Sequence, residues 1–273
     1  MKKRFVLSFV TFLIITMCCF AVNPEKDFNY KLADDGESII ITGFKNNLNL
    51  YDIPSEIEEI PVTAVDIEFL GFPDIPEILI KLPDGLKQFT LVQTYSRNAP
   101  LSHITVDVLP ATLEKCKIRT QKNKKNPEVF YISLKGSIKK LTQVLEFQTD
   151  CVDFEEKSIT VRKEWQNVKY RPIKAMYSFD SSNIEEVIFE EGLQIVTGFS
   201  NCLKLKRVTL PSTIKVFGTD AFKFCSMLSE VTVPESVEAE KSYGSQAFYG
   251  TSLPLKTQVK LRKIGYPGLF GNE

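Results

Sequence analysis

Residues 205–228 read LKRVTLPSTIKVFGTDAFKFCSML, and this stretch decides the fold. It opens with a short segment whose first, fourth and sixth residues are apolar, and it ends with the module Ala-Phe-x-x-Cys followed by leucine. The same apolar offsets recur from Ile184 and from Leu228, which lie 21 residues before and 23 residues after Leu205. A period of this length predicts a solenoid, in which each turn covers the apolar edge of its neighbour.

A second marker repeats with the same period. Phenylalanine and cysteine of the closing module each have a counterpart 23 residues earlier, and one more phenylalanine follows in the next turn. The residues assigned to these structural positions are Phe199, Cys202, Phe222, Cys225 and Phe248. Two independent markers that share one period make chance similarity a poor explanation.

Residues 210–228 closely resemble the repeat of the BspA-like, or Treponema-type, leucine-rich repeat family of bacterial surface and secreted proteins, and residues 35–66 resemble the family's opening segment. The resemblance implies an α/β to mainly β solenoid, built as a right-handed leucine-rich-repeat horseshoe with a parallel concave sheet. It also implies short helical or irregular convex turns, an N-terminal β cap and an irregular insertion. Its functional implication is adhesion to host proteins or to other bacteria.

Strand geometry predicts which side chains meet in each turn. Alternate residues of a strand point to opposite faces, so Val208 and Leu210 should face the core while Arg207 and Thr209 face outward. We expect the phenylalanines to stack on the opposite side. The two cysteines should lie about 5 Å apart, one turn from each other, which a disulfide tolerates. We favour free thiols that act as small buried hydrophobes, with a disulfide as the alternative.

The repeats become irregular towards the N-terminus. Apolar residues keep the same offsets from Ile75, Leu101 and Val129 without the closing module, and residues 150–180 fit no repeat although parts of them resemble strands. The expected organisation is a signal peptide at 1–21, an N-terminal cap and first repeat at 22–66, degenerate repeats at 67–149, an insertion or hairpin at 150–180, regular repeats at 181–252 and a C-terminal cap at 253–273.

The first 21 residues have the layout of a secretory signal peptide. Lys2, Lys3 and Arg4 precede an apolar segment at 5–20, and Cys19-Phe20-Ala21 resembles a cleavage site. We therefore expect export, with the mature chain at the cell surface, secreted or in the periplasm. A lipoprotein with Cys18 or Cys19 lipidated is the alternative, and membrane contact is expected only through the leader or such an anchor.

Composition narrows the possible partners. The chain has 273 residues, 43% of them hydrophobic, with 34 basic and 34 acidic residues, which argues against disorder and against a nucleic-acid partner. Charge nevertheless segregates: residues 51–86 carry a net −8 and residues 114–141 a net +7. Such a dipolar rod could attract an acidic partner or stack head to tail, and a lysine-rich loop at 121–126 is the simpler interpretation.

Nothing in the sequence predicts catalysis. The common nucleotide, hydrolase and metalloprotease motifs are absent, the chain has one histidine, and no Cys-x-x-Cys pair occurs. We therefore expect a non-enzymatic protein with no catalytic residue, no metal and no cofactor. An exported hydrolase that uses Asp150, Asp153 or Glu155 is the alternative, and a cell-envelope scaffold without a specific ligand is a third possibility.

The expected function is binding of a host or bacterial surface protein. The solenoid would present a continuous strip of outward-facing residues on its concave sheet, with an aromatic anchor at position 131. The strip comprises Glu77, Leu79, His103, Thr105, Tyr131, Ser133, Glu186, Ile188, Arg207, Thr209, Glu230 and Thr232.

Overall fold

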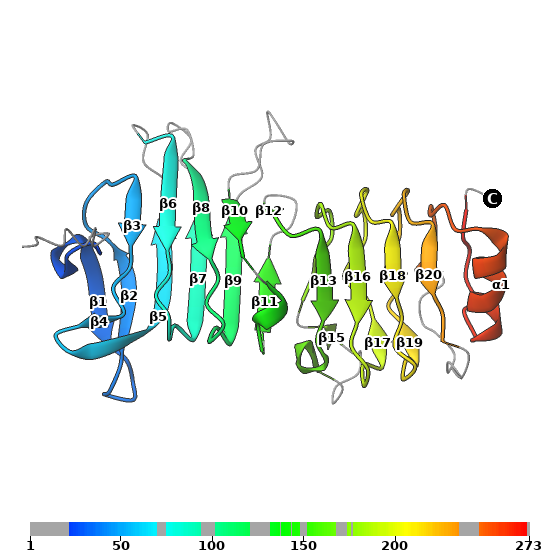
Figure 1. The fold of residues 1–273 in the computed structure, drawn as a ribbon, viewed down its shortest axis with the longest axis horizontal. Coiled ribbons are helices and arrows are strands. Elements are labelled where there is room, and N and C mark those ends of the chain that lie inside the picture. The colour runs from blue at the N-terminus through cyan, green and yellow to red at the C-terminus, as the bar shows by residue number, and fades with distance from the viewer. Residues whose placement is uncertain are drawn as a thin grey trace, which may run out of the picture.

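The computed structural model describes residues 22–69, 75–93, 102–120, 132–136, 138–142, 144–147, 152–167, 174–175, 177–234 and 246–271. In these ranges the chain is a leucine-rich-repeat solenoid of parallel strands with little helix, as the repeats predict. Its strands follow one another along the long axis, from β1 (Phe28–Leu32) at one end to α1 (Leu255–Lys263) at the other (Figure 1). The expected signal peptide lies outside the described residues.

The N-terminal half, residues 22–154, is built from two sheets. Sheet A has the order β1, β2 (Ile39–Phe44), β5 (Ile60–Phe69), β7 (Gln88–Gln93), β9 (Lys115–Thr120) and β11 (Val144–Phe147), with β4 (Glu56–Ile57) attached to β5. Sheet B has the order β12 (Val152–Phe154), β10 (Ile132–Lys135), β8 (His103–Val108), β6 (Glu77–Lys81) and β3 (Leu50–Asp52). From β5 to β11, successive turns supply one strand to each sheet.

Alternation of apolar and polar residues explains these strands. In β6, β7 and β9 every second side chain is buried, and the same holds for most of β8. The buried positions carry mainly branched aliphatic residues, which suit a pleated surface covered on one side. They include Ile78, Ile80, Ile104 and Val106 from sheet B and Leu91 and Ile118 from sheet A.

An antiparallel cap closes the N-terminal end. β1 and β2 form a hairpin with a bulge at Asn29 and Tyr30, and η1 (Glu25–Asp27) precedes it. Asn23 covers the open edge of β3, because its backbone N–H donates to the carbonyl oxygen of Asp52 at 3.1 Å and its side-chain oxygen accepts the N–H of Asp52 at 2.5 Å. The cap therefore satisfies an edge that would otherwise invite pairing with another chain.

The C-terminal half, residues 158–271, starts a new sheet. Sheet D has the order β13 (Ser158–Val161), β16 (Glu186–Phe189), β18 (Arg207–Thr209) and β20 (Glu230–Thr232), all parallel. Its strands are short, and β17 (Ile195–Val196) and β19 (Val216–Phe217) form a small second pair. Leu205, Val208 and Leu210 are buried as expected.

Stacked phenylalanine rings form the other wall of this half. Successive ring centroids along Phe179, Phe199, Phe222 and Phe248 lie 5.4, 6.1 and 5.2 Å apart, with interplanar angles of 11°, 18° and 27°. The predicted stack of three phenylalanines is confirmed, and Phe179 adds a fourth. Two residues after each ring the backbone adopts a positive φ, at Ser181, Asn201, Phe224 and Gly250.

Phe224 is the unusual member of this left-handed series. A bulky side chain rarely adopts a φ of 60°, whereas serine, asparagine and glycine tolerate it better. The side chain of Phe224 leans over Gly250, where an added Cβ would stand 2.7 Å from Cδ1 of the ring. Gly250 thus leaves the space that lets an aromatic side chain occupy this turn.

α1 closes the C-terminal end, and it was not expected from the sequence. Pro254 precedes the helix, and Lys260, Arg262 and Lys263 stand in its last turn, where cations favour the helix dipole. Gly265, with φ 95°, ends it in a Schellman motif: the N–H of Gly265 donates to Arg262 O at 3.1 Å and that of Tyr266 to Leu261 O at 3.0 Å.

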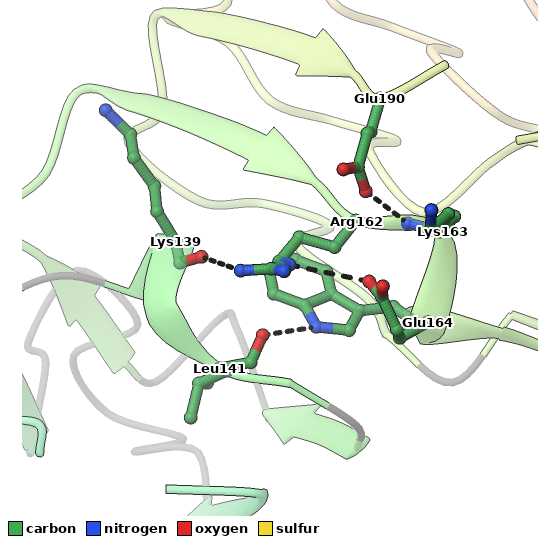
Figure 2. Close-up of polar contacts among 7 residues, drawn as sticks. Lys139, Leu141, Arg162, Lys163, Glu164 and Glu190 are labelled. Carbon is green, nitrogen blue, oxygen red and sulfur yellow. Dashed lines mark hydrogen bonds and ion pairs between the residues drawn. The ribbon is translucent and has the colours of Figure 1, made fainter. Parts of the chain in front are cut away.

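The two halves meet at a seam where each sheet changes. Sheet B ends at β12 and sheet D begins only three residues later at β13, while β11 is the last strand of sheet A. Side chains bridge the seam: the buried indole of Trp165 donates to Leu141 O at 2.9 Å, and the Arg162 guanidinium to Lys139 O at 3.4 Å (Figure 2). On the C-terminal side of the seam, the side-chain amide of Gln166 pairs with both the N–H and the carbonyl oxygen of Ile195.

The seam changes how residues 150–180 are understood. Instead of standing outside the repeats, β13 continues sheet D in register with β16, and Phe179 continues the ring stack. A hairpin is present, but among the described residues it is confined to β14 (Gln166–Asn167) and β15 (Lys174–Ala175). Cysteine is replaced by Ser182 in this turn, which hides the repeat from a search for Phe-x-x-Cys.

Candidate binding surface

The outer face of sheet D carries two rows of side chains that run across its strands. The first row follows the register Ser158, Glu186, Arg207 and Glu230. The Arg207 Nε lies 3.2 Å from Glu186 Oε1, so the centre of the row is an ion pair. That hydrogen bond and the charges of the glutamates on both sides raise the pKa of Arg207 above its ordinary value. The charged members of the row therefore alternate in sign.

The second row lies two residues further along the same strands. It follows the register Thr160, Ile188, Thr209 and Thr232, so three threonines flank one isoleucine. Ile188 is 36% exposed although it stands in the middle of the sheet. The two rows together give a flat surface with hydroxyls, opposed charges and one apolar centre, all held on hydrogen-bonded strands.

The outer face of sheet B carries the N-terminal members of the expected strip. Glu77 stands beside His103, and a second row follows the register Leu79, Thr105 and Ser133. The His103 Nε2 lies 2.9 Å from Ser133 Oγ, which fixes the imidazole across two strands. Tyr131, the expected aromatic anchor, lies outside the described residues.

The expected continuous strip is therefore divided between two sheets. Its N-terminal residues belong to sheet B, and its C-terminal residues belong to sheet D, which starts at β13. β12 and β13 are consecutive in the chain, so the two sheets occupy successive positions within one turn rather than one shared surface. The apolar offsets could not reveal this, because the strands of both sheets bury alternate residues.

Sequence reasoning missed one strand of the sheet D surface. Ser158 and Thr160 extend the two rows by one strand, since Ile159 and Val161 are buried in register with Val187 and Phe189. The alternation at 158–161 was the available signal. It was assigned to an insertion because no Phe-x-x-Cys module stands before it.

The cysteines are structural. Cys116, Cys202 and Cys225 are buried free thiols, as favoured from the sequence, while Cys151 lies outside the described residues. The Cys202 thiol donates to Phe179 O at 3.0 Å and that of Cys225 to Phe199 O at 2.9 Å. Each sulfur thus satisfies a carbonyl one turn back, beside the ring stack. Burial raises the pKa of the Cys225 and Cys116 thiols, which keeps them protonated and unreactive.

Two of the three acids proposed for a hydrolase, Asp153 and Glu155, lie within the described residues. The Asp153 carboxylate accepts a hydrogen bond from the Asn183 amide at 2.8 Å, and Glu155 is exposed. Asp150 lies outside the described residues. No group of His, Cys, Asp and Glu side chains within the described ranges could hold a metal ion.

Comparison with known proteins agrees with the class of protein that these features define, a leucine-rich-repeat solenoid. Residues 154–266 match the family described as the BspA type leucine rich repeat region, in six copies. This part of the chain is therefore similar to the BspA type leucine rich repeat region. The match begins at Phe154, where sheet B gives way to sheet D.

Solved structures of leucine-rich-repeat proteins were also found. The chain is 21% identical to a Treponema pallidum leucine rich repeat protein, with 93% of this chain and 100% of that chain covered and a TM-score of 0.45. It is 11% identical to a leucine rich cell surface protein of Faecalibacterium prausnitzii A2-165, with 84% and 80% covered and a TM-score of 0.24. A leucine-rich repeat protein of Bacteroides ovatus ATCC 8483 shows 13% identity, coverage of 93% and 99% and a TM-score of 0.22.

A search of curated proteins gave no match. In the described part of the chain, no helix has the length and apolar character needed to cross a membrane.

Proposed function

We propose that the chain is an exported, non-catalytic adhesion protein that binds a host or bacterial surface protein through the outer face of sheet D. The observation that carries the proposal is the pair of rows on this face, with Ile188 exposed between threonines and Arg207 between two glutamates. An exposed apolar centre with a polar surround is the usual arrangement of a protein interface.

The chemistry of the surface favours a protein partner. Arginine is over-represented among the residues that dominate interface energetics, and an ion pair that lies flat on a sheet can exchange partners when a complementary surface docks. The rigid ladder beneath the rows reduces the entropy lost on binding. Export and adhesion rest on the signal-peptide layout and on the resemblance to the surface and secreted proteins of the BspA-like family.

The test is a binding measurement with paired variants on the two sheets. Extracellular proteins captured by the immobilised chain are identified by mass spectrometry, purified, and titrated against wild type, Ile188→Glu with Arg207→Glu, and the control Thr105→Glu on sheet B. We expect the sheet D variant to weaken the Kd by about tenfold or more, which corresponds to about 1.4 kcal/mol, and the control to leave it unchanged. Loss of binding in the sheet B control alone would place the site on the other sheet.

A further inference from the structure

The two ends of the solenoid carry opposite charge. Residues 22–60, which form the N-terminal cap and the first turn, contain nine acidic and three basic residues, a net −6. Residues 246–271, which contain the last turn and α1, have four basic residues and no acidic one, a net +4. These segments lie at opposite ends of the long axis in Figure 1. This polarity differs from the internal charge segregation of residues 51–86 and 114–141 and runs from one end of the solenoid to the other.

The C-terminal end presents an apolar and basic helix face. α1 packs inward through Leu261, which is fully buried, and Leu255 and Val259 are 74% and 46% exposed. One helical turn separates these two residues, so they share a face. Exposed lysines at positions 256, 260 and 263 stand beside them. We call Leu255, Lys256, Val259, Lys260 and Lys263 the tail face.

The N-terminal end presents an apolar and acidic face. Tyr30 and Leu32 of β1 are 36% and 52% exposed, and they stand two residues apart on the last strand of sheet A. The Tyr30 hydroxyl lies 3.4 Å from Glu58 Oε1, which places the turn between β4 and β5 beside this strand. The exposed carboxylates of Glu56, Glu58 and Glu59 belong to that turn or to β4. We call these five residues the head face.

A terminal turn of a solenoid normally has a polar outer surface, because exposed apolar residues at an open end promote association. Both ends of this chain keep two large apolar residues exposed, and each pair is surrounded by charges opposite to those at the other end. We propose that the tail face of one copy docks on the head face of a second copy, so that the solenoids assemble head to tail.

The geometry of this contact determines what it builds. It joins two different surfaces of identical chains, so each added copy leaves a free head and a free tail, and the product is an open filament. β1 is antiparallel to β2, and α1 occupies the other end, so the contact is made by side chains rather than by a continued strand ladder. Its ionic component makes association weaker at high salt.

Sedimentation of the purified exported chain tests the proposal. We expect the average mass of the wild type to rise with concentration and to fall when salt is added. Reversing the tail with Lys256→Glu and Lys260→Glu, or reversing the head with Glu56→Lys and Glu59→Lys, should weaken the apparent Kd by about tenfold or more. Both variants change exposed side chains, and circular dichroism confirms that each remains folded.

An equimolar mixture of the two reversed variants is the decisive sample. The substitutions change the head face from −3 to +1 and the tail face from +3 to −1, so in each variant alone the two faces have net charges of the same sign. In the mixture every reversed head face can meet a reversed tail face, so association should return. Arg207→Glu on sheet D is the matched control and should associate like the wild type. Association that survives both reversals, or a mixture that stays monomeric, would overturn the proposal. So would a wild type that stays monomeric but cosediments with phosphatidylglycerol vesicles through its tail lysines, since the tail face would then bind membranes.

Discussion

Aliphatic side chains fill the N-terminal half of the solenoid between sheets A and B, whereas the C-terminal half stacks phenylalanine rings beside the short strands of sheet D. The strands of β7, β8 and β9 are six residues long, and those of β18 and β20 are three. Where the strands are long, their backbone hydrogen bonds hold successive turns together, and branched aliphatic residues fill the core between the sheets. Where they are short, side chains supply the contacts between turns.

The buried cysteines show most directly how side-chain contacts replace backbone contacts between turns. Cys202 and Cys225 each hydrogen-bond to a carbonyl of the preceding turn, a role that strand pairing performs in the other half. Cys116 in β9 is buried as well, but its backbone takes part in the ladder between β7 and β11. The same residue type is therefore a connector between turns in one half and a space-filling residue in the other.

Substitutions at the seam between the two halves should cause the largest loss of unfolding free energy. Trp165 is fully buried where the two halves meet, so Trp165→Ala should cost about 3–5 kcal/mol of unfolding free energy through the cavity it leaves. It should also separate the unfolding of the halves, giving two transitions by circular dichroism in urea. Trp165→Phe is the matched control: it keeps most of the volume, leaves Leu141 O unpaired and should cost about 1–3 kcal/mol. A single transition in both variants would show that the core alone couples the halves.

Alkaline pH tests the buried thiols in both halves. Burial raises the folded-state pKa of Cys116 and Cys225, so the native chain retains protons that the unfolded chain releases above about pH 8.5. The stabilisation that these protonated thiols contribute is therefore fully present below that pH. Above it, the free energy of unfolding falls by about 1.4 kcal/mol per pH unit for each thiol. Urea titrations at increasing pH measure the slope. Cys116→Val should reduce it, and an unchanged slope would mean that other groups titrate.

Removing one connector separates the two roles of cysteine. Cys225→Ala leaves Phe199 O without its donor and creates a small cavity, so we expect a loss of about 1–2 kcal/mol. Cys116→Ala should cost less, because only packing is removed. Urea unfolding of the two variants provides the comparison, and equal losses would contradict the connector role.

Substitutions on the surface of sheet D should change the unfolding free energy least. The pair Arg207 and Glu186 is exposed to solvent, so a double-mutant cycle with Arg207→Ala and Glu186→Ala should show coupling within the error of an unfolding measurement. A clear coupling would mean that the row stabilises the fold, which would weaken its assignment to binding.

The sequence predicted the C-terminal half in more detail than the N-terminal half. Phe199, Phe222 and Phe248 belong to a marker that recurs in successive turns, so their stacking and the direction of Val208 and Leu210 could be derived from spacing. Phe179 was missed because Ser182 replaces the cysteine that follows it by three residues. α1 was missed because Leu261 is its one buried residue, while Leu255 and Val259 are exposed, so the helix has no apolar stripe that faces the core.

The expected binding strip shows where such spacing fails. Outward-facing residues such as Leu79 and Thr209 follow the same alternating sequence pattern on every sheet of a solenoid, so the pattern does not identify the sheet. Which sheet they belong to depends on how far the chain has advanced around the turn, and the strand pairings of the structure show it. The extension of sheet D by Ser158 and Thr160 follows from the pairing of β13 with β16.

The ring stack also bears on how this protein can change in length over generations. Phe199 and Phe222 each lie between two other phenylalanines at nearly the same separation. A duplicated turn inserted between them would meet on both sides the neighbours it already has, so a gene can gain or lose whole turns there without new compensating mutations. The turn that contains Trp165 has no such freedom, because its partners above and below differ. Duplication of that turn would therefore require compensating changes that duplication of a phenylalanine turn would not.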